Sequence, residues 1–150
     1  MDIASLEAEA SRLIFPRFEE AEALALGLAM LAMAQAGALK VVINIRSANR
    51  TLFHAALPGS SANNDTWARR KSNTALHFGV ASLLVGTRLR LKAETLSDQG
   101  LALADYADHG GAVPIRVTGA GVVAVATVSG LPQLEDHALV VRAMAALLAP

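Results

Sequence analysis

A histidine followed by two glycines occupies the middle of Tyr106–Ile115, which reads YADHGGAVPI. Paired glycines readily adopt positive φ angles, and their lack of side chains lets a ligand or a second chain approach the backbone closely. His109 is suited to act as a general base or a metal ligand if it projects into a cleft. The same pattern also fits an exposed histidine in a turn that leads into a strand. Both interpretations stay open, and His109, Gly110 and Gly111 are candidate site residues.

A second polar stretch reads NNDTWARRKSNTALHF and precedes this motif in the chain. On a helix, Arg70 shares one face with Thr74 and His77, and Lys71 lies beside them. A basic, hydroxyl-bearing face near a helix N-terminus can hold a carboxylate or phosphate group. The alternative is a solvated basic face, with Trp67 anchoring the first turn in the core. Trp67, Arg70 and Lys71 are the candidates for ligand binding in this stretch.

The third stretch, VSGLPQLEDH at Val128–His137, combines the end of an apolar strand with the start of a helix. Ser129 is either a nucleophile beside His109 or His137, or an N-cap. The residue two positions before Ser129 is Thr127, so the G-x-S-x-G pattern of hydrolase nucleophiles is missing, which disfavours a catalytic serine. The candidates for ligand binding here are Ser129, Gly130 and His137.

The remaining ionisable residues give little support for catalysis or metal binding. Glu135 and Asp136 fall in the first turn of the predicted last helix, where carboxylates interact favourably with the helix dipole. The four histidines never occur at the H-x₃-H or H-E-x-x-H spacings, and no glycine-rich phosphate loop is present. We therefore predict no metal site and assign no catalytic residue.

Two pairs of adjacent strands are predicted to position these stretches. The first pair covers residues 39–47 and 51–57, and the second flanks the turn at Gly119–Gly121. Strands joined by such short turns pair antiparallel, and they leave no room for the crossover helices of a parallel nucleotide-binding sheet. With helices packed on this sheet, the predicted fold class is α+β, an α/β sandwich.

Three helices are expected around the sheet. They cover residues 18–36, ending at Gly37, about 66–84, and 133 onward with Pro132 in the first turn. The first has two adjacent apolar stripes, which predict a largely buried helix; these are Leu24, Leu28 and Leu31, then Leu26, Met30 and Met33. Residues 88–108 predict only short helical pieces broken at Gly100.

The composition limits the partners of the chain. Its 150 residues predict a single domain, residues 1–150, and 53% of them are hydrophobic. The mean hydropathy of +0.41 is high for a soluble monomer of this size, so we expect a homo-oligomer that covers the surplus apolar surface. The net charge of zero gives no field that would attract nucleic acid or an anionic membrane.

A cytoplasmic location is the expectation from the chain's own signals. The chain has no cysteine, which excludes disulfides and thiolate chemistry and is compatible with a reducing compartment. The N-terminal residues include acids where a signal peptide needs positive charge, and the longest apolar stretch is short for a membrane span.

Three ordered motifs resemble those of a known group of proteins. The chain is similar to the haem-degrading-domain-like superfamily, which includes the GlcG, HbpS and PduO C-terminal proteins. It resembles uncharacterised protein family number three hundred and three most closely. The motifs are Trp67-x-x-Arg70-Lys71, then His109-Gly110-Gly111-x-x-Pro114-Ile115, then Val128-Ser129-Gly130-Leu131-Pro132 with Asp136 and His137.

This resemblance implies a profilin-like antiparallel sheet with flanking helices, assembled as a homo-oligomer. Related proteins of the wider superfamily bind haem or corrinoids, and others have no assigned activity. A fungal member of the closer group is associated with the machinery that delivers tail-anchored proteins. Fold alone does not imply function, so the resemblance predicts the fold more sharply than the activity.

Our leading hypothesis is an oligomeric module that binds a small anionic or tetrapyrrole-type molecule. Arg70 and Lys71 would neutralise its carboxylate, phosphate or haem propionates, and His109 or His137 would supply a hydrogen bond or an axial ligand. The alternative is a structural or adaptor protein that acts through protein–protein contacts. An enzyme using His109 as general base is the least favoured reading, since no matched nucleophile or acid is evident.

Overall fold

The computed structural model describes residues 1–150 and contains one five-stranded sheet in the order β1-β4-β5-β2-β3. The two predicted hairpins are present as β2–β3 and β4–β5, and β2 also pairs antiparallel with β5. The strands are β1 (Ile14–Phe15), β2 (Val42–Arg46), β3 (Thr51–Ala56), β4 (Ala112–Val117) and β5 (Gly121–Ser129).

One pairing differs from the predicted antiparallel sheet. The two-residue strand β1 pairs parallel with β4, so the sheet is mixed. Two residues are too few to display the alternation that identifies a strand in a sequence. The α+β class is confirmed, with helices on both faces of the sheet.

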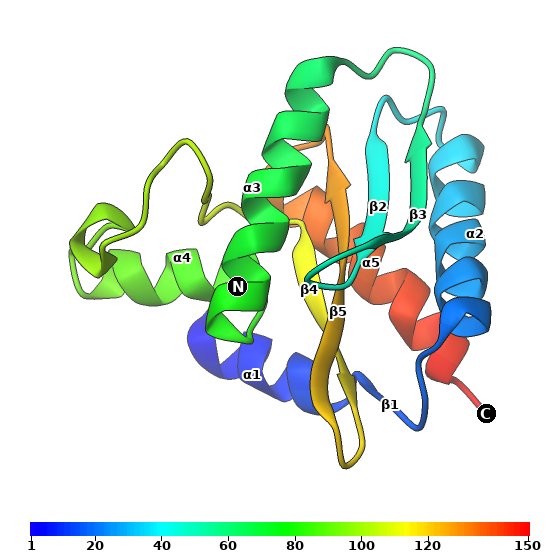
Figure 1. The fold of residues 1–150 in the computed structure, drawn as a ribbon, viewed down its shortest axis with the longest axis horizontal. Helices are drawn as coiled ribbons and strands as arrows, with labels where there is room; N and C mark the ends of the chain where they lie inside the picture. The colour runs from blue at the N-terminus through cyan, green and yellow to red at the C-terminus, as the bar shows by residue number, and fades with distance from the viewer.

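The helices form two layers around the sheet. In Figure 1, α3 crosses one face of the sheet, while α2 and α5 cover the other. The helices are α1 (Ile3–Ser11), α2 (Glu20–Ala36), α3 (Ala62–Phe78), α4 (Ser82–Leu91) and α5 (Gln133–Leu148), with a 3₁₀ turn at Ser97–Gln99.

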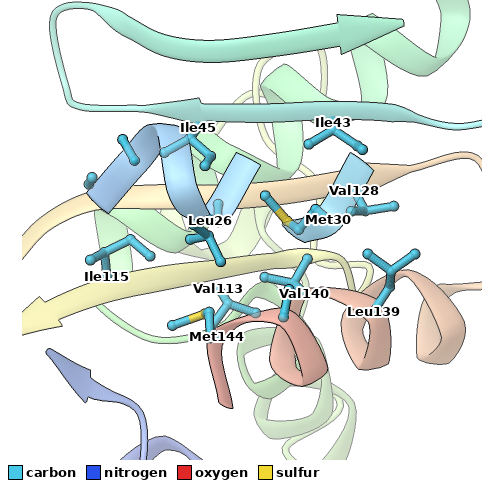
Figure 2. Close-up of a cluster of buried hydrophobic side chains, with 14 of the residues drawn as sticks. Leu26, Met30, Ile43, Ile45, Val113, Ile115, Val128, Leu139, Val140 and Met144 are labelled. Atoms are coloured by element: carbon cyan, nitrogen blue, oxygen red, sulfur yellow. The ribbon is translucent and has the colours of Figure 1, made fainter. Parts of the chain in front are cut away.

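The larger core lies between the sheet and the α2–α5 layer (Figure 2). Leu26 and Met30 of α2 meet Met144 of α5 there, all with no exposed surface. Strand alternation divides β5 between the two faces: Val128 belongs to this core, while Thr127 meets α3 through a 2.7 Å hydrogen bond with Ser72. Ser129, which follows Val128 in β5, is therefore expected on the α3 side.

The helix predicted at 66–84 is in fact two helices. Gly79 adopts a left-handed conformation with φ of 71°, which ends α3, and α4 starts at Ser82. The ambiguous region after residue 88 contains the end of α4 and the 3₁₀ turn, and α1 was not predicted at all. Gly37 ends α2 as expected, but the left-handed residue is Ala38, with φ of 49°.

The prediction of a largely buried helix at 18–36 is only half correct. Leu26 and Met30 are fully buried, whereas Leu24 and Leu28 are 53% and 50% exposed. Leu24 and Leu28, from the first of the two predicted stripes, therefore lie on the outer surface of the chain. No helix in the structure has the length and apolar character needed to span a membrane.

Candidate functional site

A polar pocket of about 250 Å³ lies where β5 ends and where α3 and α5 begin. Three segments far apart in the sequence build it: the first turns of α3, the loop at His109–Gly110, and the connection from β5 to α5. Its lining residues are Asn63, Asn64, Trp67, Lys71, His109, Gly110, Ser129, Gly130, Leu131, Gln133 and Asp136. The structure thus brings together most of the residues singled out from the three motifs.

A buried ion pair forms part of the pocket wall. Lys71 Nζ lies 3.0 Å from Asp136 Oδ2, and the two side chains are only 3% and 4% exposed. The ammonium also donates to the carbonyl oxygens of Gly110 at 3.0 Å and Val128 at 2.8 Å. An ammonium has three N–H groups, so all donors of Lys71 are used within the chain. Lys71 therefore has no donor left for a ligand.

The carboxylate of Asp136 is equally occupied. It accepts the backbone N–H of Leu131 at 2.9 Å and that of Gly130 at 3.4 Å, besides the Lys71 ammonium. Burial raises the pKa of Asp136, against the opposing effect of Lys71 and these N–H groups, and burial lowers the pKa of Lys71. The pair fixes the β5–α5 connection to α3.

Two glycines permit the close packing around this pair. Gly111 has φ of +136°, and a side chain there would overlap Lys71 Nζ and lie 2.5 Å from the Val128 carbonyl oxygen. Gly130 has φ of +145°, and a Cβ would lie 2.5 Å from the carbonyl oxygen of Lys40. Gly111 lies behind the pocket, and its role in the structure is to let the buried ammonium reach the backbone.

Several polar groups of the pocket have no partner within the chain. The Ser129 hydroxyl forms no hydrogen bond although the residue is only 2% exposed, and strand alternation directs it to the α3 side. The side chains of Asn63 and Trp67 also form no hydrogen bond within the chain. These groups remain free to contact a molecule in the pocket.

His109 lies at the rim of the pocket. Its side chain is 50% exposed, and its ring packs edge-on against Trp67 at a centroid distance of 5.1 Å. The nearest carboxylate, on Asp108, is 3.7 Å from Nδ1. Gly110 is held in place by Gln133, whose side-chain oxygen accepts the Gly110 N–H at 3.0 Å.

Arg70 lies outside the pocket, although it neighbours Lys71 in sequence. Its guanidinium donates to the carbonyl oxygens of Leu103 at 2.8 Å and Tyr106 at 3.4 Å, and lies 4.5 Å from the centre of the Trp67 ring. Arg70 therefore holds the loop that leads to His109, and it does not reach the pocket interior.

His137 also lies elsewhere. It is 2% exposed, its Nε2 lies 2.6 Å from Glu9 of α1, and its Nδ1 is buried without a partner. It borders a separate small cavity of about 50 Å³. No group of three His, Cys, Asp or Glu side chains lies close enough to hold a metal ion.

Sequence reasoning missed five of the lining residues as site residues, one of them Leu131, which was quoted only as part of the third motif. Asn63, Asn64 and Gln133 were not singled out, and Asp136 was assigned only a favourable position near a helix N-terminus. Asp136 occupies that first turn and also neutralises Lys71. The only feature of the sequence that pointed to Asp136 was its position in the third motif.

Comparisons with known proteins agree with the motifs. A family model described as "Haem degrading protein HbpS-like" matches residues 18–145. A UPF0303 protein of Streptomyces coelicolor is 47% identical over 143 residues, which are 95% of this chain and 90% of that protein. A UPF0303 protein of Burkholderia thailandensis is 45% identical over 149 residues, 99% of this chain and 90% of that one.

Solved structures show the same fold. The crystal structure of the Ybr137w protein superposes with a TM-score of 0.89 at 30% identity, covering 99% of this chain and 88% of that one. The crystal structure of a PduOC–haem complex superposes with a TM-score of 0.70 at 18% identity, covering 89% and 95%, and supports the fold alone. The family predicted from the motifs is confirmed: the chain belongs to the HbpS-like family and, within it, to the UPF0303 proteins.

Proposed function

We propose that this protein binds a small polar molecule in the pocket between α3, α5 and the His109–Gly110 loop. The observation that carries the proposal is the hydroxyl of Ser129, a residue only 2% exposed, which has no hydrogen-bond partner in the chain and borders the pocket. A hydroxyl that forms no hydrogen bond within the chain and faces a pocket is left to a ligand, and a hydrogen bond there contributes about 0.5–1.5 kcal/mol. The side chains of Asn63 and Trp67 also have no partner in the chain and can form further hydrogen bonds to the ligand.

Haem does not fit this pocket. Ligand sites for large organic molecules are mostly apolar and have volumes of about 300–1,000 Å³. This pocket has about 250 Å³, and only two of its 11 lining residues are hydrophobic. The two cations expected to bind propionates are also engaged elsewhere, Lys71 with Asp136 and Arg70 with the loop carbonyls. We therefore do not propose haem as the ligand of this pocket, although the chain has the HbpS-like fold.

A ligand retained through purification tests the proposal. We expect native mass spectrometry of the folded protein to show a small adduct that disappears on denaturation. The variant Ser129→Ala removes only a hydroxyl and is expected to lower the adduct fraction, while Ser11→Ala, at the exposed end of α1, leaves it unchanged. If the adduct is absent and no polar compound raises the melting temperature of the wild type, the proposal fails.

A second proposal concerns assembly, and it rests on the outer face of α2. Leu24 and Leu28 are about half exposed, and no charged residue occurs between Glu22 and Lys40. A surface of this kind is unusual on a monomer unless it is covered. We propose that a second copy of the chain covers it, in line with the high mean hydropathy of +0.41.

Sedimentation velocity distinguishes this homo-oligomer from a free surface. We expect the wild type to sediment as an oligomer and Leu24→Glu/Leu28→Glu to sediment as a smaller species with its far-UV circular dichroism unchanged. Leu91→Glu, which alters a leucine that is 76% exposed on α4, serves as the control. A wild type that is monomeric at all concentrations would overturn the proposal.

A further inference from the structure

Resting on the proposed ligand pocket, we infer that its ligand carries an oxyanion, a carboxylate or a phosphate, held by uncharged donors. Lys71 and Arg70 do not supply these donors, because all three N–H groups of Lys71 are used within the chain and Arg70 lies outside the pocket. The donors come instead from the first turns of two helices and from the Ser129 hydroxyl.

The first turn of α3 presents free N–H groups beside the pocket. Ser61 is the N-cap, and the first backbone hydrogen bond of the helix runs from the N–H of Asn64 to the Ser61 carbonyl oxygen at 2.9 Å. The N–H groups of Ala62 and Asn63 precede it and have no partner in the helix. Asn63 lines the pocket, so the positive end of the helix dipole lies at its wall.

The first turn of α5 repeats this arrangement from the other side. Pro132 is the N-cap, and the N–H of Glu135 makes the first bond, to the Pro132 carbonyl oxygen at 2.9 Å. The N–H groups of Gln133 and Leu134 precede it, and Gln133 lines the pocket. Both helices are long, with 17 residues in α3 and 16 in α5, so each carries a developed dipole.

The Ser129 hydroxyl is the independent sign that a ligand group belongs here. Ser129 is only 2% exposed, its side chain lies on the α3 side of β5, and its hydroxyl forms no hydrogen bond within the chain. A hydroxyl donates readily to an oxyanion, and such charge-assisted hydrogen bonds are about twice as strong as neutral ones. The hydroxyl and the two helix N-termini border one small space.

The charges around the pocket permit an anion. Asp136 is the only acidic residue among those lining it, and Lys71 neutralises that carboxylate within the wall. Asp108 does not line the pocket, and its Oδ1 lies 3.7 Å from His109 Nδ1. No unpaired carboxylate therefore faces the space in which the oxyanion would lie.

Acetate and acetamide test this inference, because they share a shape and differ in charge. We would titrate the ¹⁵N-labelled full-length protein with acetate, acetamide and inorganic phosphate at constant ionic strength set with sodium chloride. Acetate or phosphate is expected to give saturable amide shifts at Asn63, Ser129 and Gln133, and acetamide none. Ser129→Ala is expected to weaken the binding of the anion about tenfold, and Ser11→Ala to leave it unchanged.

The possible outcomes test the oxyanion inference separately from the proposed ligand-binding function. Binding of phosphate alone or of acetate alone supports the inference and identifies the source of the oxyanion. The inference is overturned if acetamide binds as tightly as acetate, or if the amide shifts are equal in the wild type and Ser129→Ala. The proposed function still stands in that case if native mass spectrometry shows a retained neutral ligand. No saturable shift with any of the three probes overturns the inference, and native mass spectrometry then decides the proposed function by itself.

Discussion

Lys71 of α3 and Asp136 of α5 form an ion pair of 3.0 Å in which both side chains are almost fully buried. Every donor of the ammonium and both carboxylate oxygens are engaged, which is the condition under which a buried pair is tolerated. The pair joins three segments, since the lysine also reaches the backbone at Gly110 and Val128. It is the structural centre of the candidate site.

Lys71→Met is expected to destabilise the protein by about 3–5 kcal/mol, because it leaves the buried carboxylate of Asp136 without a counter-charge. The double variant Lys71→Met/Asp136→Asn is expected to recover part of this loss, since the amide oxygen still accepts the Leu131 N–H. Chemical denaturation of the four members of the cycle measures the coupling. Arg88→Met, which breaks an exposed pair with Glu7, serves as control and is expected to cost below about 1 kcal/mol. Strict additivity of the two buried substitutions would contradict the prediction.

Stability is expected to depend on pH through Lys71. Burial lowers the pKa of Lys71 below its ordinary value of 10.5, although Asp136 opposes the shift. Between the folded pKa and 10.5, the unfolded chain binds more protons at this lysine than the folded chain does. The contribution of Lys71 to the free energy of unfolding therefore rises with pH through this window and is lost as pH falls through the folded pKa.

Two measurements check this dependence. The ¹³Cε shift of Lys71 is expected to titrate with a midpoint below 10.5. The free energy of unfolding of the wild type minus that of Lys71→Met is expected to rise from neutral pH toward 10.5. Lys92→Met, at an exposed lysine, controls for the loss of one positive charge. A difference that stays flat across this range would be incompatible with a lowered pKa.

Gly111→Ala is expected to cost more than about 4 kcal/mol, because the new methyl group would overlap the Lys71 ammonium. Gly119→Ala is the matched control: its φ is +78°, and nothing lies within 4 Å of the position of the new Cβ. It is expected to cost only the backbone strain, about 1–2 kcal/mol. Thermal and chemical denaturation measure both values, and equal costs would show that the ammonium is not confined at this position.

Arg70→Ala is expected to release the loop before His109. The guanidinium holds the carbonyl oxygens of Leu103 and Tyr106, and no other side chain of α3 bonds to either of these oxygens. Hydrogen exchange of the amides at 103–108 is expected to accelerate, while the global stability changes little. Arg50→Ala, which removes an exposed contact with Glu20, is the control and is expected to leave the loop unchanged. Unchanged exchange in Arg70→Ala would show that other contacts suffice to hold the loop.

Much of the fold follows from local patterns. Both hairpins are predicted from β-branched segments around short turns, and the last helix follows from its apolar spacing and Pro132. The boundary at Gly79 was not recognised, because the apolar spacing of α3 runs into that of α4. Strand β1 carries no local signal and is placed by its pairing with β4.

The sequence by itself determined the family and the three segments of the candidate site, because their residue types and order are distinctive. It did not determine which of two neighbouring polar residues faces the pocket. Successive residues of a helix point about 100° apart, so Lys71 turns inward where Arg70 meets a loop, and Asp136 meets Lys71 where His137 meets Glu9. Only the packing of α3, α5 and α1 around the sheet decides these directions, since burial of a charge depends on the partner that tertiary structure supplies.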